Sequence, residues 1–152
     1  LIGMHFLNPI SKIEMVEIVR GLTTSNEAFE SAKALASKLG KAPVEVLESP
    51  GYITTRIIVP LINEAIYALM EGIASKEDID NAIRLGFRFE KGPLALADQI
   101  GLDTVLAWME NLFREYGDLK YKPCPLLKKL VRAGKLGLKS KEGFFNYKET
   151  EE

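Results

Sequence analysis

The sequence predicts a mainly α-helical chain that opens with a short segment of the order β-β-α-β. Strand-like segments are found before residue 48, whereas beyond Pro50 apolar residues recur at helical intervals and there is almost no strand signal. Between the two regions, Glu48-Ser49-Pro50-Gly51 interrupts both patterns. We therefore predict one domain over residues 1–48 and a second, all-helical domain over residues 49–152.

The first of these domains alternates strands with one helix. Leu1 to Leu7 is apolar on both alternating faces, which is typical of a strand buried on both sides, and Asn8-Pro9 ends it because proline removes a ladder donor. Thr24 followed by Glu27 has the spacing of a capping box and predicts the start of a helix. The expected elements are strands over residues 1–7, 14–20 and 42–47 and a helix over about 25–39.

The second domain contains almost no strand signal. A long helix from Tyr52 to about Gly72 is apolar on most sides, so we expect it to be buried in its own domain or against another subunit, and Pro60 is expected to kink it. Phe144, Phe145 and Tyr147 are expected to pack the tail onto the bundle, with 149–152 frayed. Further helices are expected over about 75–86, 93–99, 103–116 and 125–133.

The one histidine of the chain, His5, lies near the end of the first strand and twelve positions before Glu17. Apolar residues surround Glu17 on its own strand, so its carboxylate is expected to be removed from water and to need a partner. An imidazole would serve, because a carboxylate that accepts from one ring nitrogen leaves the other free to exchange a proton with a substrate. The spacing also allows a histidine of the core and an unrelated glutamate at a strand end.

Six motifs in register resemble the 3-hydroxyacyl-CoA dehydrogenase family. The family's catalytic histidine lies in a His-Phe-x-Asn-Pro motif with a glutamate twelve residues on, as His5 and Glu17 do here. A Pro-Gly-Phe-x-x-Asn-Arg motif resembles residues 50–56. The remaining matches are Ile62-Asn63-Glu64-Ala65, Ser75-Lys76-Glu77-Asp78-Ile79-Asp80, residues 91–103, and Gly137 to Phe145.

This resemblance implies that residues 1–48 are the last part of an NAD-binding Rossmann-type domain and that the helical domain is the family's C-terminal, dimer-forming domain. It implies that His5 is the general base for the L-3-hydroxyacyl-CoA substrate, with Glu17 orienting it, and that Asn8 positions the substrate or the nicotinamide. Thr55 stands where the family usually has a substrate-contacting asparagine. A threonine has a shorter reach, so the acyl chain length preferred is open.

No two glycines are two positions apart, so the phosphate-binding Gly-x-Gly-x-x-Gly turn is absent from this sequence. We expect the NAD site to lie mostly upstream of Leu1, the sequence to be a fragment, and the isolated chain to be inactive. Two alternatives stay open. One is a helical dimerisation module without turnover, and the other is a dehydrogenase on the same scaffold that oxidises a sugar acid.

Composition excludes several classes of function. The formal net charge is −1, from 20 basic and 21 acidic residues, so no basic surface for nucleic acid is expected. No apolar run approaches the ~20 residues of a membrane helix, and no metal site is expected. Cys124 is the only cysteine, which favours a reducing compartment and a cytoplasmic protein. We interpret Glu64 and Asp98 as structural carboxylates.

Overall fold

The computed structural model of the chain describes residues 1–148. It divides into two compact units, Leu1–Thr54 and Thr55–Glu152. The domain boundary after residue 48 stays a prediction, and the fraying predicted for Glu149 to Glu152 lies outside the described residues.

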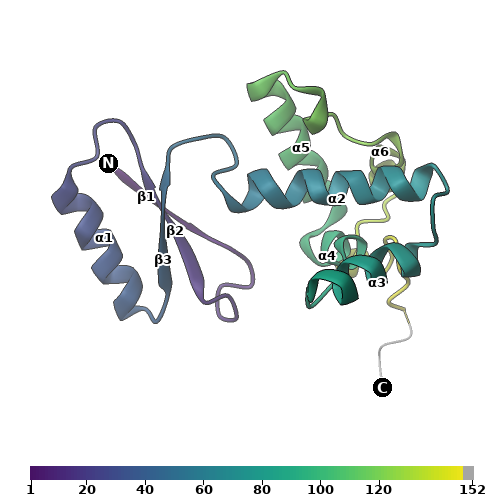
Figure 1. The fold of residues 1–152 in the computed structure, drawn as a ribbon, viewed down its shortest axis with the longest axis horizontal. Coiled ribbons are helices and arrows are strands. Elements are labelled where there is room, and N and C mark those ends of the chain that lie inside the picture. The colour runs from purple at the N-terminus through teal and green to yellow at the C-terminus, as the bar shows by residue number, and fades with distance from the viewer. Residues whose placement is uncertain (149–152) are drawn as a thin grey trace. The chain divides into compact units, whose positions relative to one another are not determined.

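The first unit is a three-stranded sheet with one helix against it (Figure 1). The predicted β-β-α-β order is confirmed. β2 is the central strand, antiparallel to β1 and parallel to β3. The buried side chains of Val16 and Ile18 pack with Phe29, Ala32 and Ala36 of the helix. The elements are β1 (Ile2–Phe6), β2 (Met15–Arg20), α1 (Asn26–Lys38) and β3 (Ala42–Leu47).

Two expectations for this unit are wrong. β1 is not buried on both sides: all its residues are of intermediate exposure, because β1 is an edge strand of the three described. The N-cap of α1 is Ser25 rather than Thr24, since the extended backbone of Ser25 lets its hydroxyl accept from the backbone N–H of Ala28. The Thr24 hydroxyl instead accepts from the N–H of Gly21 and donates to the carbonyl of Leu1.

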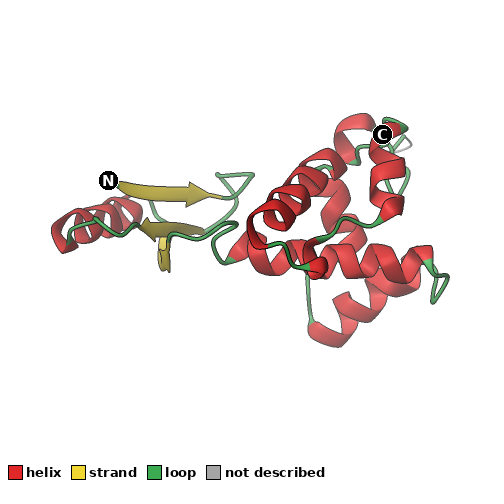
Figure 2. Cartoon of the chain, turned by 90° about the horizontal axis from the view of Figure 1, so that it is seen from above, coloured by secondary structure: helices red, strands yellow, loops and turns green. Residues whose placement is uncertain are grey.

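The second unit is helical through its described residues, apart from isolated β-bridges in the tail (Figure 2). One hydrophobic core joins α2 to the helices that follow, through Val59, Ile62, Leu94, Val105 and Leu127 among others. The elements are α2 (Thr54–Met70), α3 (Lys76–Phe87), α4 (Pro93–Ile100), α5 (Leu102–Tyr116), α6 (Pro125–Arg132) and the 3₁₀ turns η1 (Leu119–Tyr121) and η2 (Leu138–Ser140).

α2 is only partly buried within the chain itself, which leaves burial against another subunit a prediction. Val59, Ile62 and Ile66 are fully buried, whereas Ile57 and Met70 are exposed, so the helix is amphipathic. Pro60 lies within it, as predicted. No helix among residues 1–148 is both long enough and apolar enough to cross a membrane.

The tail packs back onto the second unit through a buried carboxylate. Asp98 at the end of α4 is fully buried and accepts hydrogen bonds from the backbone N–H groups of Phe144 and Phe145 and from the hydroxyl of Tyr147. This confirms the structural interpretation of Asp98 and the return of the tail onto the bundle. Glu64, by contrast, is exposed on α2.

Candidate functional site

The predicted acid–base pair comes together across the first two strands. The antiparallel register of β1 and β2 places His5 directly opposite Glu17, so the two side chains leave the same face of the sheet. The distance from His5 Nδ1 to Glu17 Oε2 is 2.6 Å. The imidazole side chain is 28% exposed, whereas the carboxylate is completely buried. One member of the pair is therefore open to solvent and the other is shielded.

Glu17 is held as a carboxylate by four donors. Besides His5, the backbone N–H groups of Ile53 and Thr54 donate to Oε1 at 3.0 and 2.9 Å, and the Thr54 hydroxyl donates to Oε2 at 3.0 Å. Burial alone would raise the pKa of Glu17, but the hydrogen bonds from His5 and from Thr54 and Ile53 outweigh it and lower the pKa below its ordinary value. The negative charge is thus retained inside the protein at neutral pH.

An ionised carboxylate can only accept hydrogen bonds, so the proton between the two side chains belongs to His5 Nδ1. In the neutral imidazole this assignment leaves Nε2 as the acceptor. The pair can therefore take up a proton at Nε2 and stabilise the resulting imidazolium through Glu17. This is the chemistry of a general base with an orienting carboxylate.

Tyr52 and Thr54 also contact the pair. Both lie in the motif of residues 50–56, but neither was predicted to contact His5 or Glu17. Tyr52 has a φ of 47°, in the left-handed region that few residues other than glycine adopt. Its ring lies 5.0 Å from the His5 ring, centroid to centroid, with the planes inclined by 50°. The turn before α2 therefore contacts His5 through Tyr52, and the first residue of α2, Thr54, contacts Glu17.

The two other predicted site residues lie in different settings. Asn8 is exposed and follows the end of β1, three positions after His5. Thr55 is buried in the first turn of α2 and belongs to the second unit. The structure thus brings His5 and Glu17 into contact and places Asn8 close to them along the chain, while the role of Thr55 stays a prediction.

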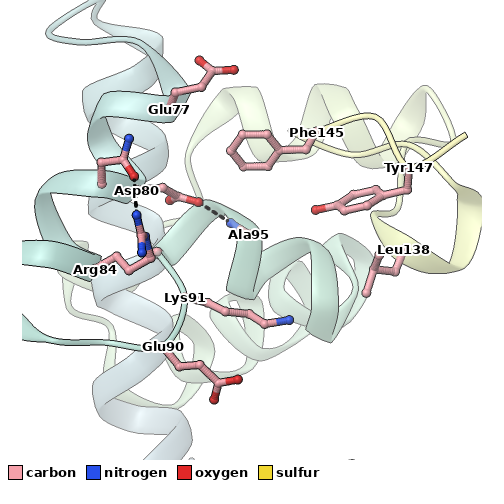
Figure 3. Close-up of a pocket in the computed structure, with 11 residues that line it drawn as sticks. Glu77, Asp80, Arg84, Glu90, Lys91, Ala95, Leu138, Phe145 and Tyr147 are labelled. Carbon is pink, nitrogen blue, oxygen red and sulfur yellow. Dashed lines mark hydrogen bonds between the residues drawn. The ribbon is translucent and has the colours of Figure 1, made fainter. Parts of the chain in front are cut away.

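A separate pocket of about 380 Å³ lies within the second unit (Figure 3). Asp80 of α3 lies in its lining, but both carboxylate oxygens accept from the first backbone N–H groups of α4, those of Leu94 and Ala95, at 2.8 and 2.9 Å. Asp80 therefore caps α4. The pocket contains none of the predicted site residues, and among residues 1–148 no group of histidine, cysteine and acidic side chains is arranged to hold a metal ion.

Two family models match the chain in sequence order. The NAD binding domain of 3-hydroxyacyl-CoA dehydrogenase matches residues 1–49, and the C-terminal domain of 3-hydroxyacyl-CoA dehydrogenase matches residues 51–147. The two matches together cover nearly all of the described chain.

Individual relatives agree with these models. A probable 3-hydroxybutyryl-CoA dehydrogenase of Bacillus subtilis is 53% identical over 98% of the chain, which covers 52% of that protein. The human mitochondrial hydroxyacyl-coenzyme A dehydrogenase is 41% identical over 96% of the chain, which covers 47% of that protein. The crystal structure of (S)-3-hydroxybutyryl-CoA dehydrogenase from Ralstonia eutropha superposes with a TM-score of 0.93 at 49% identity, over 97% of this chain and 52% of that one. The chain thus spans about half the length of the relatives it matches.

Proposed function

The chain belongs to the 3-hydroxyacyl-CoA dehydrogenase family, and from this premise we propose that it supplies the catalytic base of an NAD-dependent oxidation of L-3-hydroxyacyl-CoA to 3-oxoacyl-CoA. The observation that carries the proposal is the 2.6 Å contact between His5 and the buried Glu17. In the family motif that this sequence resembles, the positions of His5 and Glu17 are those of the catalytic histidine and its glutamate.

In the oxidation direction, His5 Nε2 takes the proton of the substrate 3-hydroxyl group. Proton removal develops negative charge on that oxygen, and the bond to hydrogen at C3 then breaks in the sense of a hydride. Glu17 holds the ring in the tautomer that leaves Nε2 as acceptor and offsets the imidazolium charge once the proton has arrived. In the reverse direction the imidazolium returns the proton to the carbonyl oxygen.

The cofactor in this proposal is NAD, supported by the match of residues 1–49 to an NAD binding domain. When bound, NAD supplies the hydride acceptor. The polar side chains of this chain suited to flank the nicotinamide are His5 and the exposed Asn8, because both lie at the carboxyl end of β1, where open α/β sheets place their ligands.

For the substrate we propose a short acyl thioester of the 3-hydroxybutyryl-CoA type, since the relatives of about half identical sequence carry that name. Asn8 and Thr55 are the substrate-contacting residues in this proposal. A threonine hydroxyl can both donate and accept, so Thr55 can replace one hydrogen bond of the family asparagine but not both ends of an amide. We also propose a cytoplasmic location, in keeping with the lone, buried Cys124 and the bacterial relatives.

A second copy of the chain is the partner that we propose, joined through the helical unit. The support is a run of exposed apolar side chains at the end of α3: Leu85, Phe87 and Phe89 are 66%, 71% and 40% exposed. Exposed apolar side chains of this size can take part in an association surface. A two-fold contact would cover the same residues on both subunits.

The experiment is a chimera in which the corresponding amino-terminal half of the Bacillus subtilis relative precedes Leu1. The chimera should oxidise 3-hydroxybutyryl-CoA with NAD, and His5→Gln should lower kcat by roughly 10²-fold or more, the usual contribution of a general base. NADH binding measured by fluorescence should be unchanged, which separates loss of the base from loss of the fold. A folded chimera that binds NADH but has no activity, or one in which His5→Gln keeps full activity, would overturn the proposal.

A further inference from the structure

Oε2 of Glu17 accepts hydrogen bonds from two donors at once. His5 Nδ1 approaches it at 2.6 Å and the Thr54 hydroxyl at 3.0 Å, while Oε1 is occupied by the backbone N–H groups of Ile53 and Thr54. A carboxylate has about four lone-pair sites, so these four donors fill it. The carboxylate cannot turn away from His5 without breaking hydrogen bonds on the opposite side.

The Thr54 hydroxyl is not needed to cap its own helix. Thr54 is the first residue of α2, and the acceptor for the backbone N–H groups at that helix start is Glu17 Oε1. A negative charge at a helix N-terminus is favourable by itself. The hydroxyl therefore adds a contact that helix capping does not require, and it adds it to the oxygen that holds His5.

A donor on that oxygen has an electrostatic consequence. The Thr54 O–H dipole points its hydrogen at Oε2 and withdraws part of the negative charge that would otherwise act on the imidazolium. Removing the hydroxyl without changing the shape of the side chain should therefore strengthen the attraction of Glu17 for a protonated His5. Loss of the Glu17 charge should do the opposite.

We propose that Thr54 is a positioning residue of the acid–base pair: its hydroxyl shares Glu17 Oε2 with His5 Nδ1 and so limits how much of the carboxylate charge acts on the imidazole. This inference rests on the proposed function for its catalytic meaning, because it describes how the proposed base is tuned. The physical effect itself belongs to the chain and can be measured without turnover.

The surroundings of His5 keep the test simple. The titratable side chains that the structure places against its ring are Glu17 from β2 and Tyr52 from the turn before α2. Tyr52 contributes an aromatic ring rather than a charge near neutral pH. A change in the titration of His5 after substitution of Thr54 can therefore be assigned to Glu17.

The test is an NMR titration of the ring signal of His5, which is unambiguous because the sequence holds one histidine. Thr54→Val, which replaces the hydroxyl with a methyl group of similar size, should raise the titration midpoint by about half a pH unit, the scale of one shared hydrogen bond. Thr54→Ser should restore the wild-type midpoint. Thr24→Val is the matched control, since the Thr24 hydroxyl also makes hydrogen bonds in the first unit but to Gly21 and Leu1.

In the chimera, the acid limb of the kcat/KM profile should move to higher pH in Thr54→Val and return in Thr54→Ser. A midpoint that is unchanged or lowered in Thr54→Val, in a chain whose spectrum is otherwise that of the folded protein, would overturn the inference. Failure of the proposed function has a different signature: the unsubstituted chimera would then be inactive, while the NMR shift would still appear.

Discussion

Glu17 lies directly opposite His5 in the antiparallel ladder of β1 and β2, and its buried carboxylate accepts the Nδ1 proton of that histidine. The strand pairing places the two residues opposite each other, and the donors of Ile53 and Thr54 hold the Glu17 carboxylate. A histidine held in this way differs from one in the core mainly in the exposure of its ring, 28% here. The pair is therefore both fixed in orientation and accessible to a substrate.

Glu17→Gln should lower the titration midpoint of His5. The substitution keeps the shape of the side chain but removes the negative charge that stabilises the imidazolium, so we expect a fall of about one pH unit. NMR of the single histidine checks this in the chain itself, and the chimera should lose turnover in parallel. If neither the midpoint nor the turnover changes, Glu17 does not act on His5. The direction is opposite to that expected for Thr54→Val.

The charged side chain of Glu17 should stabilise the folded chain at neutral pH and lose this effect in acid. Hydrogen bonding lowers the pKa of the folded Glu17 below its ordinary value of 4.5, so its contribution is present above that value and is lost as pH falls through the lower, folded pKa. The difference in free energy of unfolding between wild type and Glu17→Gln should therefore shrink as the pH falls below about 4.5.

Urea denaturation followed by circular dichroism at neutral and acidic pH measures this difference. Glu30→Gln on α1 is the control, because Glu30 is exposed and its ion pair with Lys33 lies on the surface. The same difference at pH 3 as at pH 7 would show that Glu17 carries no favourable charge in the folded state.

Much of the fold was predictable because local patterns and tertiary packing agree. Helical periodicity located the described α-helices to within a few residues, and the apolar residues around Glu17 in β2 anticipated that its side chain is buried. The predictions that were wrong concern features that depend on tertiary packing. The edge position of β1 depends on neighbours that no local pattern encodes, and Ser25 rather than Thr24 caps α1, since the Thr24 hydroxyl bonds to Gly21 and Leu1.

The part of the site that strand register determines, the pair of His5 and Glu17, could be predicted from the sequence. A spacing of twelve residues is compatible with a pair across two antiparallel strands, and the observed register places His5 opposite Glu17. Tyr52 and Thr54 could not be found this way, because they reach the pair from the turn after β3, far along the chain. A non-glycine residue at positive φ, as at Tyr52, also leaves no signal in the sequence.

Asp98→Ala should destabilise the helical unit strongly. The substitution leaves the buried N–H groups of Phe144 and Phe145 and the hydroxyl of Tyr147 without their acceptor. At ~1–3 kcal/mol for each donor left unsatisfied, we expect a loss of at least about 3 kcal/mol. Fluorescence of Trp108, the only tryptophan, reports on this unit because its ring packs against the same core.

The matched control for Asp98→Ala is Glu110→Ala, which removes a carboxylate from a surface ion pair with Lys128. Its unfolding midpoint should stay close to that of the wild type. Equal losses in the two variants would mean that Asp98 does not hold the tail.

Sedimentation should show the chain as a homodimer that depends on the end of α3. Phe87 is the most exposed of the three apolar side chains there, at 71%, and Phe87→Lys replaces it with a charged one. Because burying that charge in a contact is costly, we expect the variant to sediment as a monomer. Leu22→Lys is the control, because Leu22 is exposed but lies in the first unit. Ile57→Lys tests the exposed side of α2 separately. The dimer is refuted if the wild-type chain is a monomer at ~100 μM, which is far above the Kd of a stable interface. If Ile57→Lys is a monomer while Phe87→Lys is still a dimer, the contact lies on α2 rather than on α3.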